Sequence, residues 1–193
     1  MQLFWKTPLL GATIFAIWKM DAQRKYRLTK DWIERGDRLL EVGSGPGSVV
    51  KVFRKQGLDV TALDIADNSI TDDLEPIIYD GDVMPFEDRS FDVALILTVL
   101  HHIAEPDKTL QEAARVSKRL IIMEDVYDTP FQAAYTKLTD KITNMEFIGH
   151  PHSNRSHAEW LDTFDRMGFT LRHSAIHRLA KFYQQAVYIV DTK

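Results

Sequence analysis

The chain has 193 residues, 45% hydrophobic and 27% charged, which fits a globular domain with one sizeable core. Its formal net charge of −4 argues against a dedicated nucleic-acid-binding protein, which normally carries a basic stripe, so we expect no nucleic-acid partner. The absence of cysteine excludes disulfides, thiolate catalysis and zinc–thiolate sites. It also fits a reducing compartment, so we expect a cytoplasmic location.

Residues 1–30 are expected to form N-terminal cap helices. Thr7 and Pro8 are typical of a helix start, and the apolar run 9–18 follows them. This run is too short to span a bilayer, which needs about 20 residues, and no signal-peptide cleavage site follows it. Basic residues downstream keep a second interpretation open, in which the helix contacts a membrane surface; they are Lys19, Arg24, Lys25, Arg27 and Lys30.

Strand-like and helix-like segments alternate from residue 37 to 126, which is typical of a parallel sheet flanked by helices. The pattern predicts helices at 47–57 and 107–117 and strands at 38–43, 59–65, 76–82, 90–100 and 119–126.

The C-terminal part, residues 156–193, begins with a predicted capping box of Ser156 and Glu159, which opens a helix that Gly168 ends. Strands are expected at 169–176 and 182–190, close enough to be antiparallel neighbours. The predicted fold is therefore α/β. It is a single domain, residues 1–193, with a doubly wound, mostly parallel seven-stranded sheet, an antiparallel C-terminal hairpin, helices on both faces and an N-terminal cap helix.

The segment LLEVGSGPGSVV, residues 39–50, places three glycines directly after the first strand. The spacing of Gly43, Gly45 and Gly47 is not the dinucleotide fingerprint G-x-G-x-x-G, because Ser48 stands where the last glycine belongs. No Gly-Lys-Ser/Thr follows, which excludes a P-loop. Glu41 precedes the loop, and a carboxylate there disfavours a pyrophosphate and favours a ligand that carries a cation.

Two further acids point to a nucleoside. Asp64 ends the second strand, where a carboxylate can accept hydrogen bonds from both ribose hydroxyls. Asp82 follows the third strand, where it can accept one from an exocyclic adenine amine. Each acid alone is more often an ordinary turn carboxylate. Three acids at successive strand ends make that reading much weaker.

The motifs LEVGSGPG, LDIAD and GDVMPFEDRSFDVALILTVLHHI, together with the closing helix and hairpin, resemble the class I, seven-stranded S-adenosylmethionine-dependent methyltransferases of the small-molecule type. The likeness is strong over residues 36–126. Two departures stand out: the usual Pro-Gly-Gly turn before the fifth strand is absent from RVSKRLIIM, and the fourth strand lacks the Asn-Pro-Pro-Tyr motif of amino-methylating DNA enzymes.

The resemblance implies S-adenosyl-L-methionine as cofactor and S-adenosyl-L-homocysteine as product. It also implies a role for each matched position. The residues that would bind the methionine end of the cofactor are Glu41, Gly43, Ser44, Gly45 and Gly47. Asp64 would bind the ribose, and Ile65, Asp82 and Val83 would bind the adenine. The backbone of Thr98 would form the edge of the reaction site.

His101 and His102 follow the fourth strand on the cofactor side and are candidates for a catalytic base, His101 being the stronger. The alternative is that they only shape the loop. The histidines of GHPHSNRSH (His150, His152 and His157) match no strong metal-ligand spacing, so no metal is expected. Residues 127–155 are expected to form a lid over the acceptor, with Tyr127, Phe131, Tyr135 and Phe147, and the N-terminal helix would add Phe4, Trp5, Phe15 and Trp18.

The predicted activity is methyl transfer to a small, partly apolar acceptor, with a lipid or a quinone-like molecule as candidates. Two alternatives stay open. One is a non-catalytic module that binds the cofactor, and the other is a nicotinamide-dependent reductase, which Glu41 and the early Gly47 oppose. The sequence leaves open the acceptor, the methylated atom, the oligomeric state, the choice between His101 and His102, and the choice between lid and membrane contact for the N-terminal helix.

Overall fold

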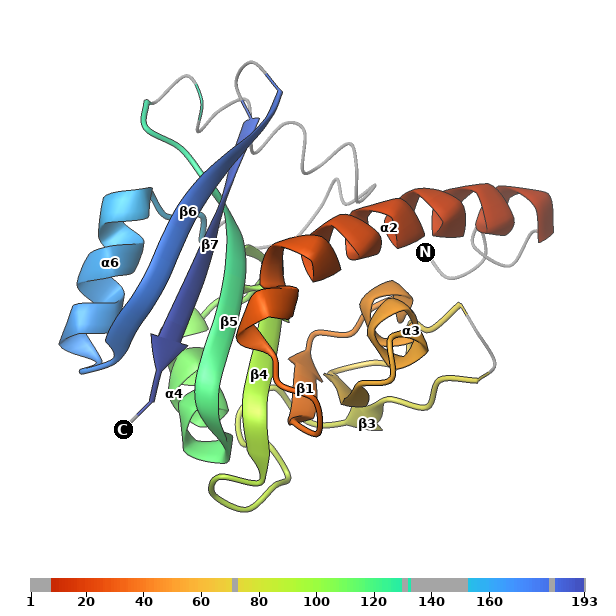
Figure 1. Cartoon of the computed structure of the whole chain (residues 1–193), viewed down its shortest axis with the longest axis horizontal. Helices are drawn as coiled ribbons and strands as arrows, with labels where there is room; N and C mark the ends of the chain where they lie inside the picture. The colour runs from red at the N-terminus through yellow and green to blue at the C-terminus, as the bar shows by residue number, and fades with distance from the viewer. Residues whose placement is uncertain (1–7, 71–72, 130–131, 133–152, 181–182, 193) are drawn as a thin grey trace.

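A single seven-stranded sheet forms the centre of the protein (Figure 1). The computed structural model describes residues 8–70, 73–129, 132, 153–180 and 183–192, with side chains from residue 15 onward. The strands lie in the order β3-β2-β1-β4-β5-β7-β6. Their bounds are Arg38–Val42 for β1, Asp59–Asp64 for β2, Ile77–Ile78 for β3, Phe91–Leu97 for β4, Ser117–Val126 for β5, Thr170–Ala180 for β6 and Tyr183–Asp191 for β7. Strands β1 to β5 pair in parallel, and β7 is antiparallel to both neighbours. The predicted fold class is confirmed.

Helices cover both faces of this sheet, as the doubly wound prediction requires (Figure 1). One face carries α2 (Pro8–Thr29) and α3 (Ser48–Lys55) over a core that includes Leu39, Val93 and Leu95. The other carries α4 (Pro106–Val116) and α6 (His157–Arg166) over a core that includes Leu40 and Ile96. Short 3-10 turns follow α2 at Lys30–Trp32 (η1) and β4 at Leu100–His102 (η2).

Side-chain alternation along β1 places the first candidate site residue on a definite face. Successive side chains of a strand point to opposite faces of the sheet. Leu39 belongs to the α2/α3 core and Leu40 to the α4/α6 core, so Glu41 points toward the α2/α3 side. Its register partners are Ala62 on β2 and Leu95 on β4, which puts Glu41 in the middle of the sheet.

Two strands are shorter in the structure than predicted. Side-chain hydrogen bonds explain the end of the first, and a change of backbone conformation explains the end of the second. The strand expected at 76–82 is only Ile77–Ile78, because Asp80 folds back to accept the amide N–H groups of Asp82 and Val83. The strand expected at 90–100 ends at Leu97, because the Thr98 backbone adopts φ 64°, the left-handed region that a threonine rarely occupies. The loops that follow these two strand ends form part of the candidate site.

The remaining predictions of secondary structure are confirmed within small shifts of boundary. The capping box is present: Ser156 Oγ accepts the Glu159 amide N–H, and Glu159 Oε2 accepts the Ser156 amide N–H at 2.7 Å. Helix α4 runs directly into β5 at Ser117, as the missing Pro-Gly-Gly turn indicated. The N-terminal helix begins at Pro8 and extends to Thr29, well beyond the apolar run. Thr7, its expected cap, lies outside the described residues.

Candidate active site

The candidate site lies at the carboxyl ends of the parallel strands, between β1 and β4. The chain proceeds from β1 outward to β2 and β3, and from β4 in the opposite direction to β5. Ligands of open α/β sheets bind at such a reversal of strand order. The predicted glycine loop follows β1 and the predicted His pair follows β4, so the topology brings the two motifs to the same edge.

The glycine loop between β1 and α3 is held against the end of β2. The amide N–H groups of Gly43 and Ser44 both donate to the Leu63 carbonyl, at 2.8 and 3.1 Å. Gly43 has φ 73°, and a Cβ there would lie 2.3 Å from Val99 Cγ2, so no other residue fits. Gly45 also has positive φ, but a Cβ there would meet nothing within 4 Å. The loop therefore presents a backbone free of side chains to open space at Gly45.

Glu41 is buried, with 3% of its surface exposed, and its Oε2 atom has no hydrogen-bond partner within the described chain. Burial, with a smaller contribution from the nearby Asp64, raises the pKa of Glu41 to about 8, although the Lys25 ammonium acts in the opposite direction. Ser44 Oγ, in the adjoining loop, is likewise buried without a partner. Buried polar groups are rarely left unsatisfied, so these two atoms mark a place where a polar ligand belongs.

Asp64 ends β2 and joins it to the glycine loop. Its Oδ2 accepts the Gly45 amide N–H at 2.7 Å, and its Oδ1 accepts the amide N–H groups of Ile65 and Ala66 at 2.7 and 3.3 Å. A carboxylate offers about four acceptor positions and three are used by these amides, so about one is left for a hydroxyl donor. Asp64, the residue predicted to bind the ribose, thus also holds the glycine loop in place, which the sequence did not indicate.

The predicted adenine contacts lie at the outer end of the same edge. Ile65 and Val83 are apolar yet 65% and 64% exposed. A Cβ on Gly81 would lie 3.5 Å from Ile65 Cγ2, so the two loops are close. Asp82 is exposed as well. The Val83 amide N–H, expected to contact adenine, points toward Asp80 Oδ1 at 3.4 Å, so the geometry there is set by a residue that sequence reasoning missed.

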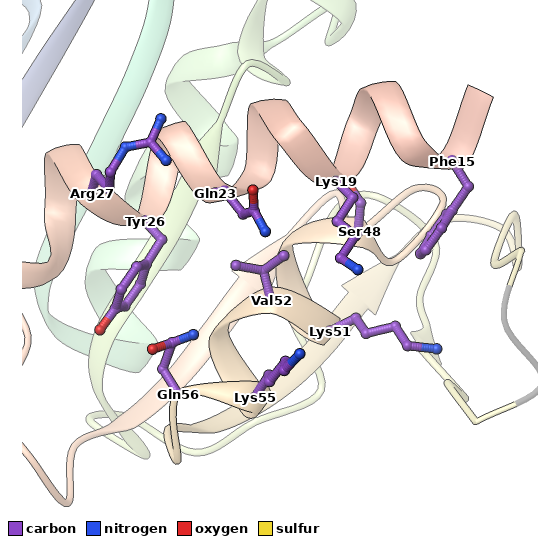
Figure 2. A pocket seen from close by; sticks show the side chains of 10 residues that line it. All are labelled: Phe15, Lys19, Gln23, Tyr26, Arg27, Ser48, Lys51, Val52, Lys55 and Gln56. Atoms are coloured by element: carbon purple, nitrogen blue, oxygen red, sulfur yellow. The ribbon is translucent and has the colours of Figure 1, made fainter. Parts of the chain in front are cut away.

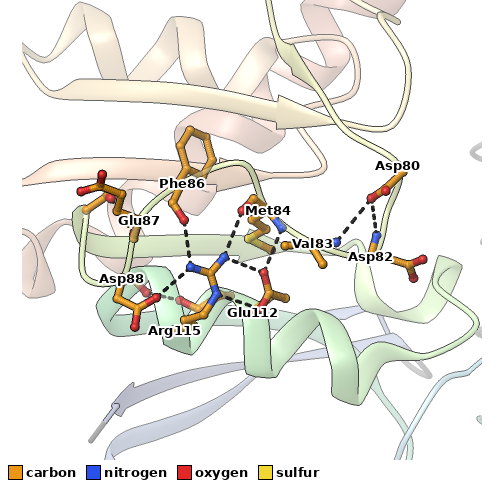
Figure 3. A network of polar contacts seen from close by, with 12 residues as sticks. Asp80, Asp82, Val83, Met84, Phe86, Glu87, Asp88, Glu112 and Arg115 are labelled. Atoms are coloured by element: carbon orange, nitrogen blue, oxygen red, sulfur yellow. Dashed lines mark hydrogen bonds and ion pairs between the residues drawn. The ribbon is translucent and has the colours of Figure 1, made fainter.

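The 84–88 part of this loop is fixed on α4 by one ion-pair network (Figure 3). Arg115 donates to the carbonyls of Met84 and Phe86 and pairs with Asp88 and Glu112. Glu112 in turn accepts the Met84 amide N–H at 2.9 Å, and its bonds with Arg115 lower its pKa. The network explains Asp88, one of the two acids of the MPFEDRS motif, as an anchor of the loop that carries Asp82 and Val83.

A buried lysine from the N-terminal helix reaches this site. Lys25 Nζ donates to Thr98 Oγ1 at 2.8 Å and to the Leu97 carbonyl at 3.2 Å, and it pairs with Asp21 at 3.2 Å. Lys25 is 7% exposed and lies on the same face of the sheet as Glu41. Sequence reasoning treated it only as one of a run of basic residues. A buried cation beside an unpartnered carboxylate matches the two charges of an amino-acid group.

His101, the stronger base candidate, is 2% exposed, and its Nδ1 lies 2.6 Å from Glu124 Oε2. The Oε1 atom of Glu124 accepts the amide N–H groups of Val99 and Leu100 at 2.9 and 2.8 Å. The glutamate, which sequence analysis did not single out, therefore holds the whole turn after β4. His102 is half-buried, with its ring centroid 4.1 Å from that of His101.

The acceptor side is described only in part. Tyr127 donates to the Asn154 carbonyl at 3.2 Å, so the start and the end of the expected lid are in contact. Asp125 is buried between Tyr183 and Gln185, and burial raises its pKa. His157 contacts the Tyr188 hydroxyl through Nδ1 at 2.9 Å. Phe4 and Trp5 lie outside the described residues. The same is true of the other residues expected in the lid and the histidine cluster, which are Phe131, Tyr135, Phe147, His150 and His152.

Residues 40–120, which carry the loop, the three acids and the histidine pair, match the model of the methyltransferase domain family. This match supports the expected likeness to the class I S-adenosylmethionine-dependent methyltransferases. A relative of this domain is the demethylmenaquinone methyltransferase of Renibacterium salmoninarum, which is 34% identical over 113 residues, 53% of this chain and 48% of the relative. The chain thus spans about half the length of the curated relatives that it matches.

Solved structures show the same fold as this methyltransferase domain. A SAM-dependent methyltransferase of Methanosarcina mazei superposes with a TM-score of 0.66 at 18% identity, covering 86% of this chain and 97% of that one. The cyclase SpnF superposes equally well, with a TM-score of 0.66 at 16% identity over 88% of this chain and 80% of its own. Because a protein named as a cyclase shares the fold, the chemistry has to be argued from the site residues.

The site fits the expected cofactor on its own geometry. Glu41 Oε2 and Ser44 Oγ supply buried acceptors that have no partner among the described residues, and the loop at Gly45 leaves space for close approach. Asp64 adds a second carboxylate on the adjacent strand. This pair of acids suits a cationic nucleoside, because a ligand ammonium favours the ionised form of Glu41 and a pyrophosphate does not, which opposes the nicotinamide alternative.

Proposed function

We propose that this chain transfers the methyl group of S-adenosylmethionine to a small, partly apolar acceptor. The observation that carries the proposal is the buried Glu41 carboxylate, whose Oε2 atom has no partner among the described residues although it adjoins the glycine loop. An uncompensated buried acceptor costs free energy, and a ligand with an ammonium group removes that cost. A dinucleotide brings no cation to this position.

Different side chains would bind different parts of the cofactor. S-adenosylmethionine, when bound, supplies a methyl group on a sulfonium, which is already activated for in-line displacement, so the protein contributes alignment and exclusion of water. Glu41 would accept hydrogen bonds from the ammonium group and Asp64 from the ribose hydroxyls. Asp82 would accept one from the adenine amine, with Ile65 and Val83 as the apolar sides of the adenine site.

His101 and His102 are proposed as the groups that take a proton from the acceptor. When Glu124 is ionised, its oxygens only accept, so His101 Nδ1 carries the hydrogen and Nε2 is the atom that can receive a proton. The imidazole of His101 is then oriented by Glu124, as a base must be oriented by a further group. If His102 is the base instead, His102→Ala alone abolishes the pH dependence of turnover while His101→Ala chiefly lowers Tm.

The acceptor is proposed to be quinone-like, because the similar protein from Renibacterium salmoninarum is named for demethylmenaquinone. A molecule of that kind resides in a bilayer, so the proposal includes contact of the N-terminal helix with a membrane surface. Among the helices that the structure describes, none is long and apolar enough to cross a membrane. The contact proposed is therefore peripheral.

The test is incubation of the purified chain with methyl-labelled S-adenosylmethionine and a short-chain demethylmenaquinol. We expect label in the quinol and formation of S-adenosylhomocysteine, with turnover lost in Glu41→Gln and kept in the surface variant Glu34→Gln. Calorimetric binding of S-adenosylhomocysteine without transfer to any acceptor in a panel would instead support a non-catalytic module. Binding of NADH at the same site would overturn the proposal.

A further inference from the structure

A groove of about 350 Å³ runs between α2 and α3 (Figure 2). Its apolar walls are formed by Phe15, Tyr26 and Val52. Tyr26 is fixed there by an edge-to-face contact with the buried Phe53, with ring centroids 5.2 Å apart. The groove is within the size range of sites for small ligands, about 300–1,000 Å³.

Four cationic side chains line this groove, and among the described residues no acidic side chain does: Lys19 and Arg27 come from α2, Lys51 and Lys55 from α3. Lys51 pairs with Asp73 at 3.3 Å and lies 5.9 Å from the centre of the Phe15 ring. In the described part of the chain, no ion pair involves Lys19, Arg27 or Lys55. Three cations that have no ion pair with any described residue thus line one groove of a chain whose net charge is −4.

Apolar side chains lie exposed on the neighbouring face of α2. Ile17 is 60% and Met20 is 69% exposed. Met20 and Arg27 are seven residues apart, so they share a face of the helix. A surface that combines cations with exposed apolar side chains suits an anionic amphiphile, with the anion at the cations and methylene groups on the apolar walls.

We propose that the α2/α3 groove binds the headgroup of an acidic phospholipid and holds the protein at a membrane surface. The phosphate would lie among Lys19, Lys51 and Lys55, and Ile17 and Met20 would enter the interface. A nucleic acid is the weaker occupant, because it needs a basic stripe longer than one groove and gains nothing from exposed aliphatic side chains. This inference rests on the proposed membrane contact of α2, but it does not require methyl transfer.

The groove and the candidate active site share two elements. Helix α3 begins at Ser48, directly after the glycine loop, and α2 carries Lys25 to Thr98. A bilayer that docks against α2 and α3 would therefore lie beside the site, and a lipid-like acceptor could pass from one to the other over a short distance. The docked bilayer would thus supply the acceptor, while the strand edge binds the cofactor.

Flotation with vesicles of phosphatidylcholine, with and without added phosphatidylglycerol, tests the proposal on the full chain. We expect binding only to the acidic vesicles and its loss at high salt. The charge reversal Lys19→Glu with Lys55→Glu should weaken binding at least about tenfold, because each basic residue near an acidic surface contributes substantially. The double variant Ile17→Ser with Met20→Ser should weaken it less.

The matched control is Lys108→Glu with Lys118→Glu, which changes net charge equally but alters exposed ion pairs on α4 and β5. It should float like the unchanged chain. Every variant is also titrated with S-adenosylhomocysteine, so that loss of vesicle binding with intact cofactor binding is separated from misfolding and from failure of the proposed activity. Equal binding to neutral vesicles, an unaffected groove variant, or release from vesicles by duplex DNA would each overturn the proposal.

Discussion

Glu41 on β1 and Glu124 on β5 are both buried glutamates near the carboxyl ends of parallel strands, 3% and 1% exposed, yet their surroundings differ completely. Glu124 has two backbone amides on one oxygen and His101 on the other. Glu41 has an oxygen with no hydrogen-bond partner within the described chain, and burial raises its pKa to about 8. Both carboxyls are buried to the same degree, but only the Glu124 carboxyl has hydrogen-bond partners on both oxygens among the described residues.

The difference separates a structural carboxylate from a binding one. A fully satisfied buried carboxylate stabilises the loop it holds, and its loss leaves several donors unpaired. An unsatisfied one destabilises the protein until a ligand arrives, which is the usual relation between stability and function at a site. The comparison predicts that the two glutamates respond in opposite ways to substitution.

The largest effect is expected for Glu124→Ala. This change leaves the amides of Val99 and Leu100 and the His101 ring without their acceptor, so the free energy of unfolding should fall by about 3 kcal/mol. Urea unfolding monitored by circular dichroism measures it. Glu124→Gln keeps an acceptor for the amides and should lose less. A loss below about 1 kcal/mol for the alanine variant would contradict the anchoring role.

Glu41→Gln should leave stability unchanged or raise it, because it removes a buried carboxyl that has no partner for one oxygen. Affinity for S-adenosylhomocysteine should fall about 100-fold, the value of a charge-assisted hydrogen bond in a buried site. Calorimetric titration measures the affinity, and Glu34→Gln serves as the exposed control. An unchanged affinity would show that Glu41 is not the ammonium ligand.

The raised pKa of Glu41 sets a pH dependence of ligand binding. Below pH 8 the carboxyl is mostly protonated, so affinity for the ammonium-bearing ligand should rise up to about tenfold per unit between pH 6 and 7, with release of a proton on binding. The stability contribution of the protonated carboxyl is fully present below the ordinary glutamate pKa of 4.5 and is lost as pH rises through the raised pKa of about 8. Calorimetry in two buffers measures the proton release, and a slope that persists in Glu41→Gln would contradict the assignment.

A smaller effect should reveal the partner charge. The Lys25 ammonium lies on the Glu41 face and contacts the Leu97 carbonyl, so it is placed to pair with the carboxylate of the methionine group. The unchanged protein should bind S-adenosylhomocysteine about tenfold better than its decarboxylated analogue, and Lys25→Met should remove that preference. Lys19→Met, on the same helix, is the control. A preference that survives in Lys25→Met would exclude this pairing.

The parts of the site that sequence reasoning found are those encoded within a few residues. The glycine loop, Glu41 and Asp64 occupy fixed positions relative to strand ends, and parallel topology then brings the strand ends together. The capping box follows from a local motif, and the strands and the closing hairpin follow from periodicity and loop length.

The parts that were missed depend on contacts between distant segments. Lys25 reaches Thr98 across 73 positions, and Glu124 reaches His101 across 23. The basic run of the N-terminal helix indicates charge but not which lysine turns inward, since that depends on how α2 docks on the sheet. Asp80 was missed because its effect, the early end of β3, comes from side-chain hydrogen bonds to the backbone, which strand periodicity does not report.

The place of β7 in the sheet has a consequence for synthesis. β7 lies between β5 and β6, although it is translated after both. Until it leaves the ribosome, β5 is an open strand edge that carries Ile121, Ile122 and Met123, and an apolar edge of this kind invites pairing with other chains. The nascent protein is therefore most prone to aggregate between translation of β5 and translation of β7. This interval ends when β7 inserts between β5 and β6 and covers the exposed edge of β5.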